Sequence, residues 1–372
     1  MSEERHHGER SSFGLLSGIR VLDCSRLIIG DLATSRLADL GADVVKVRDP
    51  ALADTLSSLP PLIAGVSLRY LLYNTNKRYL DLDPDDRSSL HDELDRCDAV
   101  VVLGTPGSLD RVGLSYDALC SSRPGLVYCA ITPYGSSGPY RDLPAHGNNI
   151  DAAAGYGDLA ADGFAVGGMF AANYAATAIL AGIWRRSRSG QGARIEVSCW
   201  AAAVEANVAF WSHLNGLEVG REHPLAPERM ASPGYGVFPC SDGKPVFLAI
   251  VTREEWRRFC RAAGVDEVAI ADAPEAPGGW LVSGRDPVGV SGVLARASRD
   301  EWMERFVAHR VPASPLLSPA ELAAESDELI GSVRSAVEVG GERVWLPGAP
   351  VVIDGEPLPT RHFEPLNSCT MP

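Results

Sequence analysis

Basic residues are scarce in this chain relative to acidic ones. Its 372 residues include 34 Lys and Arg against 48 Asp and Glu, which gives a net charge of −14. This balance argues against a general nucleic-acid or anionic-membrane surface, because such a surface needs a basic field. A local cluster of Arg and Lys that holds an anionic ligand is still compatible with it.

Signals for metal binding, secretion and membrane insertion are also missing. The eight cysteines form no C-x-x-C pair and no spacing typical of zinc sites, so we expect reduced, buried thiols and no bound metal. Residues 1–12 are polar and charged and lack the apolar core of a signal peptide, which predicts a disordered tail. The apolar helical stretch 174–184 is too short to cross a bilayer. We therefore expect a cytoplasmic protein with no nucleic-acid or membrane partner.

Strands and helices alternate through the first half of the chain. Residues 20–24 form a short β-type run, 31–40 have helical apolar spacing with Asp31 as a helix cap, and 43–47 form a second strand. This βαβ unit implies a parallel sheet. Further expected strands and helices are 79–82, 86–95, 99–103, 115–121 and 126–131. We predict an α/β fold, with a large, open, Rossmann-like parallel-sheet domain over residues 13–215.

The pattern changes after Trp211. Residues 236–243 and 245–250 are typical of a β-hairpin, and 254–263 and 300–309 of amphipathic helices. We predict a smaller α+β domain over residues 225–330. The Pro- and Gly-rich segment 335–372 is expected to return to the large domain.

The order of short motifs along the chain resembles CoA-transferase family III. This is the CaiB/BaiF family, which includes formyl-CoA transferase and α-methylacyl-CoA racemase. The matching segments are 18–26, 37–47, 76–78, 106–116, 138–141, 312–315 and 346–350. Residues 168–184, followed by Ser189-Gly-Gln-Gly192, resemble the family's active-site helix. The resemblance implies an acyl-CoA substrate, a carboxylic acid acceptor and no permanently bound cofactor. It also implies an interlocked homodimer, or a heterodimer with a homologous subunit, with CoA between the two domains.

The position that the resemblance assigns to the nucleophile holds Gly168. In the family mechanism an aspartate at the start of this helix attacks the thioester, giving a mixed anhydride and then an enzyme–CoA thioester. Glycine has no side chain for this step. Asp162, a few residues upstream, is the candidate that a shifted alignment would bring to the site.

Several residues are candidates for holding CoA, whose phosphates need Arg or Lys side chains and backbone N–H groups. Lys77, Arg78 and Arg111 are expected at turns beside strands. The resemblance implies that Arg111 and Tyr134 contact CoA. Gly30, expected to open the first helix, would present N–H groups.

Three functions stay open for an acyl-CoA-binding protein of this kind. The first is CoA transfer, or an altered chemistry on an acyl-CoA thioester. The second is a non-catalytic subunit that pairs with a homologous, aspartate-bearing chain. The third is a racemase-like or lyase activity, because Ala145-His146 followed by Asn149 resembles the racemase motif G-H-D-x-N-Y, in which the histidine removes the α-proton. The opposing racemase aspartate, however, again falls near Gly168.

Overall fold

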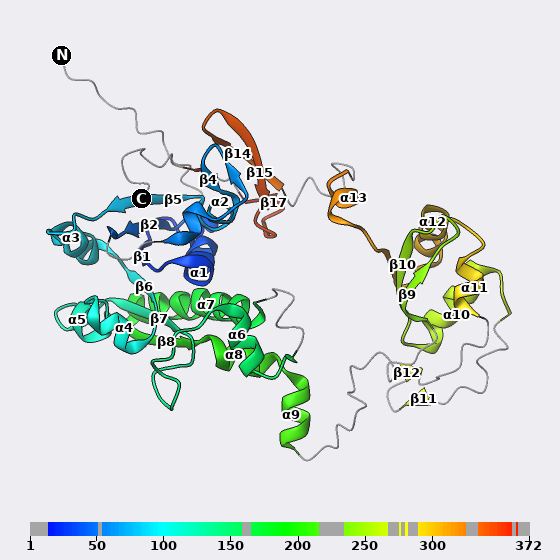
Figure 1. The fold of residues 1–372 in the computed structure, drawn as a ribbon, viewed down its shortest axis with the longest axis horizontal. Coiled ribbons are helices and arrows are strands. Elements are labelled where there is room, and N and C mark those ends of the chain that lie inside the picture. The colour runs from blue at the N-terminus through cyan, green and yellow to red at the C-terminus, as the bar shows by residue number, and fades with distance from the viewer. Residues whose placement is uncertain are drawn as a thin grey trace. The chain divides into compact units, whose positions relative to one another are not determined.

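The structure is a computed structural model that describes residues 14–50, 54–157, 165–215, 234–266, 275–276, 280–281, 289–324, 334–358 and 362–363. The chain divides into two compact units (Figure 1). The first comprises residues 1–207 together with 327–372, and the second comprises residues 208–326.

A six-stranded, fully parallel sheet forms the centre of the first unit. In spatial order its strands are β5 (Lys77–Asp81), β2 (Asp43–Arg48), β1 (Arg20–Cys24), β6 (Ala99–Leu103), β7 (Val127–Thr132) and β8 (Ala193–Ser198). The chain therefore builds outward from β1 in one direction and from β6 in the other. The predicted α/β fold with a parallel sheet is confirmed, and β1 and β6 mark the point where ligands bind in sheets of this order.

Helices cover both faces of this sheet, as the side chains of β7 illustrate. Val127, Cys129 and Ile131 belong to one apolar cluster, and Tyr128 and Ala130 belong to the other. Helices α1 (Leu27–Asp39) and α7 (Val166–Ser189) pack on the first face, and α3 (Ser88–Arg96), α4 (Pro106–Arg111) and α5 (Tyr116–Cys120) pack on the second. Burial on both faces explains why the strands read as continuous apolar runs.

Helix α7 is longer than the apolar stretch 174–184 that the sequence suggested. It has 24 residues and is long and apolar enough to cross a membrane by length and composition alone. Its inner face is made of small buried residues that let it approach the sheet closely, and a Cβ on Gly182 would lie 2.7 Å from Val127. This packing is typical of a core helix.

Smaller elements complete the first unit. They are η2 (Thr55–Ser58), β3 (Leu62–Ile63), β4 (Val66–Ser67), α2 (Leu68–Asn74), α6 (Gly147–Ala153), α8 (Cys199–Ala206), β14 (Arg334–Val339), β15 (Glu342–Pro347), β16 (Val352–Ile353) and β17 (Glu356–Pro357). The antiparallel hairpin β14–β15 shares an apolar cluster with α2, and Asn76 and His362 exchange two hydrogen bonds of 2.7 and 2.8 Å. The described residues from 334 to 363 thus pack within the first unit.

The second unit has its own core. The antiparallel strands β9 (Tyr235–Pro239), β10 (Pro245–Ala249) and β13 (Ala313–Pro315) pack with α10 (Arg253–Ala263), α11 (Val290–Leu294) and α12 (Arg299–His309). The remaining elements are α9 (Val208–Leu214), β11 (Glu275–Ala276), β12 (Trp280–Leu281) and α13 (Pro319–Ala324). Capping boxes at Thr252 and Ser298 begin the helices where the sequence predicted them.

Candidate functional site

The carboxyl ends of β6 and β7 lead into two polar turns that lie side by side. After β6, the Thr105 hydroxyl accepts the N–H of Ser108 at 3.2 Å and begins α4. After β7, the Thr132 hydroxyl accepts the N–H of Gly135 at 3.0 Å, and Gly135 has a φ of +92°. Since these strands are neighbours, both turns belong to one edge of the sheet.

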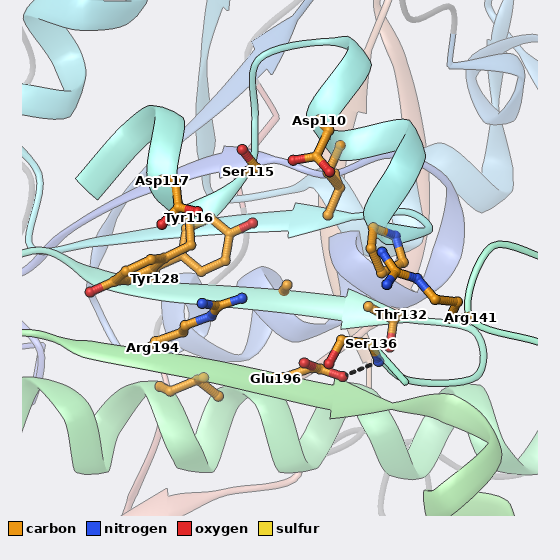
Figure 2. Close-up of a pocket in the computed structure, with 14 residues that line it drawn as sticks. Asp110, Ser115, Tyr116, Asp117, Tyr128, Thr132, Ser136, Arg141, Arg194 and Glu196 are labelled. Carbon is orange, nitrogen blue, oxygen red and sulfur yellow. Dashed lines mark hydrogen bonds between the residues drawn. The ribbon is translucent and has the colours of Figure 1, made fainter. Parts of the chain in front are cut away.

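Two carboxylates bond the loop after β7 to its neighbours in the fold. Asp142, from the loop after β7, accepts the N–H of Gly107 at 2.8 Å and pairs with Arg141 at 3.1 Å. Glu196 of β8 accepts the N–H of Ser136 at 2.5 Å (Figure 2). The loop after β7 is therefore bonded to the start of α4 through Asp142 and to β8 through Glu196.

A pocket of about 280 Å³ lies between α4 and α5 on one side and β7 and β8 on the other (Figure 2). The Arg194 guanidinium is 4.9 Å from the centre of the Tyr116 ring, and the Tyr128 hydroxyl donates to the carbonyl of Leu114 at 2.9 Å. The charged residues that line the pocket are Asp110, Asp117, Arg141, Arg194 and Glu196. Such a lining suits a polar ligand group.

A second part of the site lies at the start of α7. Asp151 of α6 is 1% exposed, and its two carboxylate oxygens accept the N–H groups of Val166 and Gly167 at 2.7 and 2.9 Å. Helix α6 itself packs directly on this point, because a Cβ on Gly147 would lie 2.4 Å from the Cβ of Ala165. A carboxylate from a neighbouring helix therefore caps α7.

Gly168 is buried in the first turn of α7, and the space beside it is filled. A Cβ at this position would lie 2.9 and 3.0 Å from the Cδ1 and Cγ1 atoms of Ile29 in α1. A side chain on residue 168 thus requires Ile29 to move.

The two lysines nearest this edge are core residues. Lys77, expected at a turn, lies in β5 and is 1% exposed; its ammonium group donates to Asp23, to the Asn74 side chain and to the Asp31 carbonyl, each at 3.0 Å. Lys46 is equally buried and pairs with the Asp31 carboxylate. Lys77 therefore lies at the start of a strand and not at a turn, and its donors are turned into the protein. Its contact with CoA stays a prediction.

Burial and pairing shift the pKa values of this cluster in different directions. Burial lowers the pKa of Lys77 despite the pull of Asp23 and Asp31, and it raises the pKa of Asp31 against the pull of both lysines. For Asp23, burial is outweighed by Lys46, Lys77 and two hydroxyl donors, so its pKa is lowered. The cluster is an internal charge network.

Three further expectations about this region are corrected. Arg78 also lies in β5, where it pairs with Asp43 at 2.7 Å. Gly30 does not open α1, which begins at Leu27; it is buried in the helix, and a Cβ there would lie 2.2 Å from Ser25. Asp31 is likewise inside the helix, so it is a buried ion-pair partner rather than a cap.

The other candidate residues are placed as follows. Arg111 ends α4 and is exposed, and Tyr134 is half-buried with its ring 5.5 Å from that of Tyr140. His146 is exposed at the start of α6, where its backbone N–H donates to the side-chain Oδ1 atom of Asn149 at 2.7 Å. Asp162 lies outside the described residues.

Sequence reasoning missed Asp151 and Ile29. Neither has a local signal: Asp151 is a carboxylate in the middle of a short helix, and Ile29 is one of two consecutive isoleucines. Their importance comes from contacts with α7, which begins 15 residues after Asp151 and more than 130 after Ile29.

Comparison with known proteins supplies the family. The model of CoA-transferase family III matches residues 16–367. The chain belongs to CoA-transferase family III. This family III chain is 29% identical over 371 residues to a succinate–glutarate CoA-transferase of Agrobacterium fabrum, covering 92% of this chain and 90% of that protein. It is 26% identical over 345 residues to the beta subunit of a succinyl-CoA–L-malate CoA-transferase of Chloroflexus aurantiacus, covering 88% and 84%.

Solved structures agree on the fold of this family III chain. A CAIB/BAIF family protein from Brucella suis superposes with a TM-score of 0.73 at 23% identity, covering 93% of this chain and 94% of that one. A hypothetical protein of Mycobacterium tuberculosis, Rv3272, gives a TM-score of 0.74 at 22% identity, covering 95% and 97%.

Proposed function

We propose that this chain binds a CoA thioester at the carboxyl edge of its parallel sheet and does not itself carry the acyl group. The observation that carries this proposal is the start of α7. Gly168 is buried, it offers no carboxylate, and Ile29 fills the space into which a side chain would extend. Residue 168 therefore has no carboxylate to carry an acyl group, and a side chain there would require the end of the Ile29 side chain to move.

Two exposed arginines on the segments that follow β6 and β7 support binding of the phosphates of CoA. Arg111 ends α4, and Arg141 lies in the loop whose neighbour Asp142 is bonded to the α4 start. Guanidinium groups bind phosphate oxygens through charge-assisted hydrogen bonds. The chain's negative net charge makes such local cations the means of anion binding.

Turnover then requires a carboxylate from elsewhere, and we propose that a homologous chain bearing the aspartate supplies it. Similarity to a protein named as the beta subunit of a CoA-transferase supports this assignment. The proposed role is that of a CoA-binding subunit in a heteromeric transferase.

His146 supports a second candidate function, proton transfer at the α-carbon of an acyl-CoA. Its exposed imidazole belongs to the residue before Gly147, which packs against Ala165 at the start of α7. A neutral imidazole in this place would act as a base on an acidic α-proton.

The test uses the purified chain alone. We expect calorimetry to detect binding of CoA and succinyl-CoA, and mass spectrometry to detect no acylated protein and no new thioester with a panel of carboxylate acceptors. Transfer by the isolated chain, or no binding of either ligand, would contradict the first proposal. A deuterium gain in the thioester in D₂O, lost in His146→Ala, would establish the second.

A further inference from the structure

We infer that Asp151 and Ile29 together keep α7 from carrying a carboxylate of its own at residue 168. Asp151 already supplies the negative charge at the helix start, and Ile29 occupies the space that a side chain on residue 168 would need. The inference rests on the proposed function, in which the acyl group is not carried by α7. It makes Asp151 a positioning residue at the start of the helix, and it predicts which substitutions would let residue 168 carry an acyl group.

The electrostatic half follows from the free N–H groups of α7. A helix begins with N–H donors that lack partners within the helix, and its start attracts negative charge. The first turn of α7 contains no acidic residue. The carboxylate of Asp151 instead accepts from Val166 and Gly167, at 2.7 and 2.9 Å, while it is 1% exposed. The place where one negative charge is most favourable is therefore already taken.

A carboxylate on residue 168 would stand in the same helix turn as Val166 and Gly167, whose N–H groups Asp151 accepts. Its Cβ would face Ile29 and Ala165, whereas it is a Cβ on Gly167 that would lie 3.1 Å from the Oδ1 atom of Asp151. Two carboxylates at one helix start repel each other, which disfavours the charged form of at least one of them. Asp151 and an aspartate at residue 168 are thus alternatives for the same helix start.

The steric half comes from α1. The Cδ1 and Cγ1 atoms of Ile29 lie 2.9 and 3.0 Å from the position of a Cβ on Gly168, closer than ordinary van der Waals contact. Ile29 also packs against the main apolar cluster, so a shift of its side chain disturbs the core. The neighbouring Ile28 packs against a different cluster, which makes it a matched control.

The first experiment separates charge from size in the folded chain. Gly168→Asp and Gly168→Asn have nearly the same volume and differ in charge, and each is made with Asp151 and with Asp151→Asn. We expect Gly168→Asp to lower the melting temperature by roughly 5 °C more than Gly168→Asn when Asp151 is present. With Asp151→Asn this difference should vanish or reverse. An equal difference in both backgrounds would overturn the electrostatic half.

The same measurement tests the steric half. The loss of melting temperature caused by Gly168→Asn should shrink when Ile29→Ala is added, and it should not shrink with Ile28→Ala. Equal rescue by both alanine variants, or by neither, would overturn the assignment to Ile29.

The last experiment tests whether a variant gains the ability to carry an acyl group on residue 168. In the triple variant Ile29→Ala, Asp151→Asn, Gly168→Asp, the new carboxylate oxygen should attack the carbonyl carbon of succinyl-CoA; a C–O bond forms, the C–S bond breaks, and CoA leaves as the thiolate. If the CoA thiolate then attacks the aspartyl carbonyl carbon of the resulting mixed anhydride, a C–S bond forms, the C–O bond to succinyl breaks and succinate leaves. We expect mass spectrometry to detect a protein adduct of succinyl mass, or of CoA mass after that second step, in the triple variant and none in Gly168→Asp alone.

Controls keep the two proposals separable. A triple variant that is folded and binds CoA like the unmodified chain, yet gives no adduct, would overturn the inference that these two residues bar acyl carriage. Failure of the unmodified chain to bind CoA would instead contradict the proposed function, and the melting-temperature cycles would still decide the roles of Asp151 and Ile29.

Discussion

Two regions of the first unit use charged side chains in opposite ways. Around α1, the side chains of Asp23, Asp31, Lys46 and Lys77 are at most 1% exposed and bond to one another or to nearby backbone. Around the pocket under α4 and α5, by contrast, Arg194 and Glu196 are exposed on edge strand β8 (Figure 2).

The difference comes from what covers each strand. The buried lysines of β2 and β5 contact Asp31 of α1 and Asn74 of α2, which cover them. In β8, an edge strand like β5, exposed and partly buried residues alternate from Ala193 to Glu196. A lysine in or next to a strand is therefore evidence of ligand binding only when neighbouring elements leave its side chain exposed. Buried charges need partners, and only exposed ones are available to an anion.

The largest expected effect is the loss of a buried cation. Lys77→Met leaves the fully buried Asp23 with one partner fewer, and breaking a buried pair typically costs about 3–5 kcal/mol. We expect the free energy of unfolding, measured by urea denaturation, to fall by that amount. Arg78→Gln is the control, because Arg78 and Asp43 are each about one-third exposed, and exposed pairs contribute at most about 1 kcal/mol. Equal losses in both variants would remove the distinction between buried and exposed charges.

A smaller effect is expected from overpacking beside the same cluster. In Gly30→Ala the new Cβ would lie 2.2 Å from the Cβ and Oγ atoms of Ser25, which itself donates to Asp23. Overpacking of this kind costs roughly 1–3 kcal/mol. Gly292→Ala is the matched control, since Gly292 is also helical and has nothing within 4 Å of its added Cβ. It should leave stability unchanged or raise it by up to about 1 kcal/mol.

The sequence predicted strands better than it predicted the site. The strands 20–24 and 99–103 have the bounds that the apolar pattern indicated, because buried parallel strands are read from local composition. Helix α1 begins at Leu27, four residues earlier than predicted, since tertiary contacts rather than a cap hold Asp31.

The site depended on contacts that no local pattern records. The motif around Lys77 predicts a turn, yet the residue pairs with Val44 in the parallel sheet and its side chain is buried. Gly168 was recognised as a departure from the family pattern, but its consequence became visible only with Ile29 and Asp151 beside it. Contacts between distant segments are set by packing, which sequence periodicity does not contain.

The next test asks whether an exposed arginine binds CoA, as the contrast between buried and exposed charges predicts. Arg111→Gln should weaken binding of CoA about tenfold, the effect of one charge-assisted hydrogen bond to phosphate. Arg188→Gln removes the same charge near the far end of α7 and should change the affinity less than twofold. Calorimetry with CoA at two salt concentrations measures both. A similar loss in the two variants would indicate a general field rather than contact by Arg111.

The smallest effect concerns a thiol next to the start of α7. Burial, followed by the charge of Asp151, raises the pKa of Cys199 to about 12. Since the thiolate is the reactive form, Cys199 should be alkylated at pH 8 far more slowly in the folded chain than in urea, as mapped by peptide mass spectrometry. The carbonyl of Cys199 is packed 2.6 Å from the position of a Cβ on Gly167. Fast modification in the folded chain would mean that α7 and α8 separate there, and a helix start that opens so readily would leave room beside Gly167 that this structure closes.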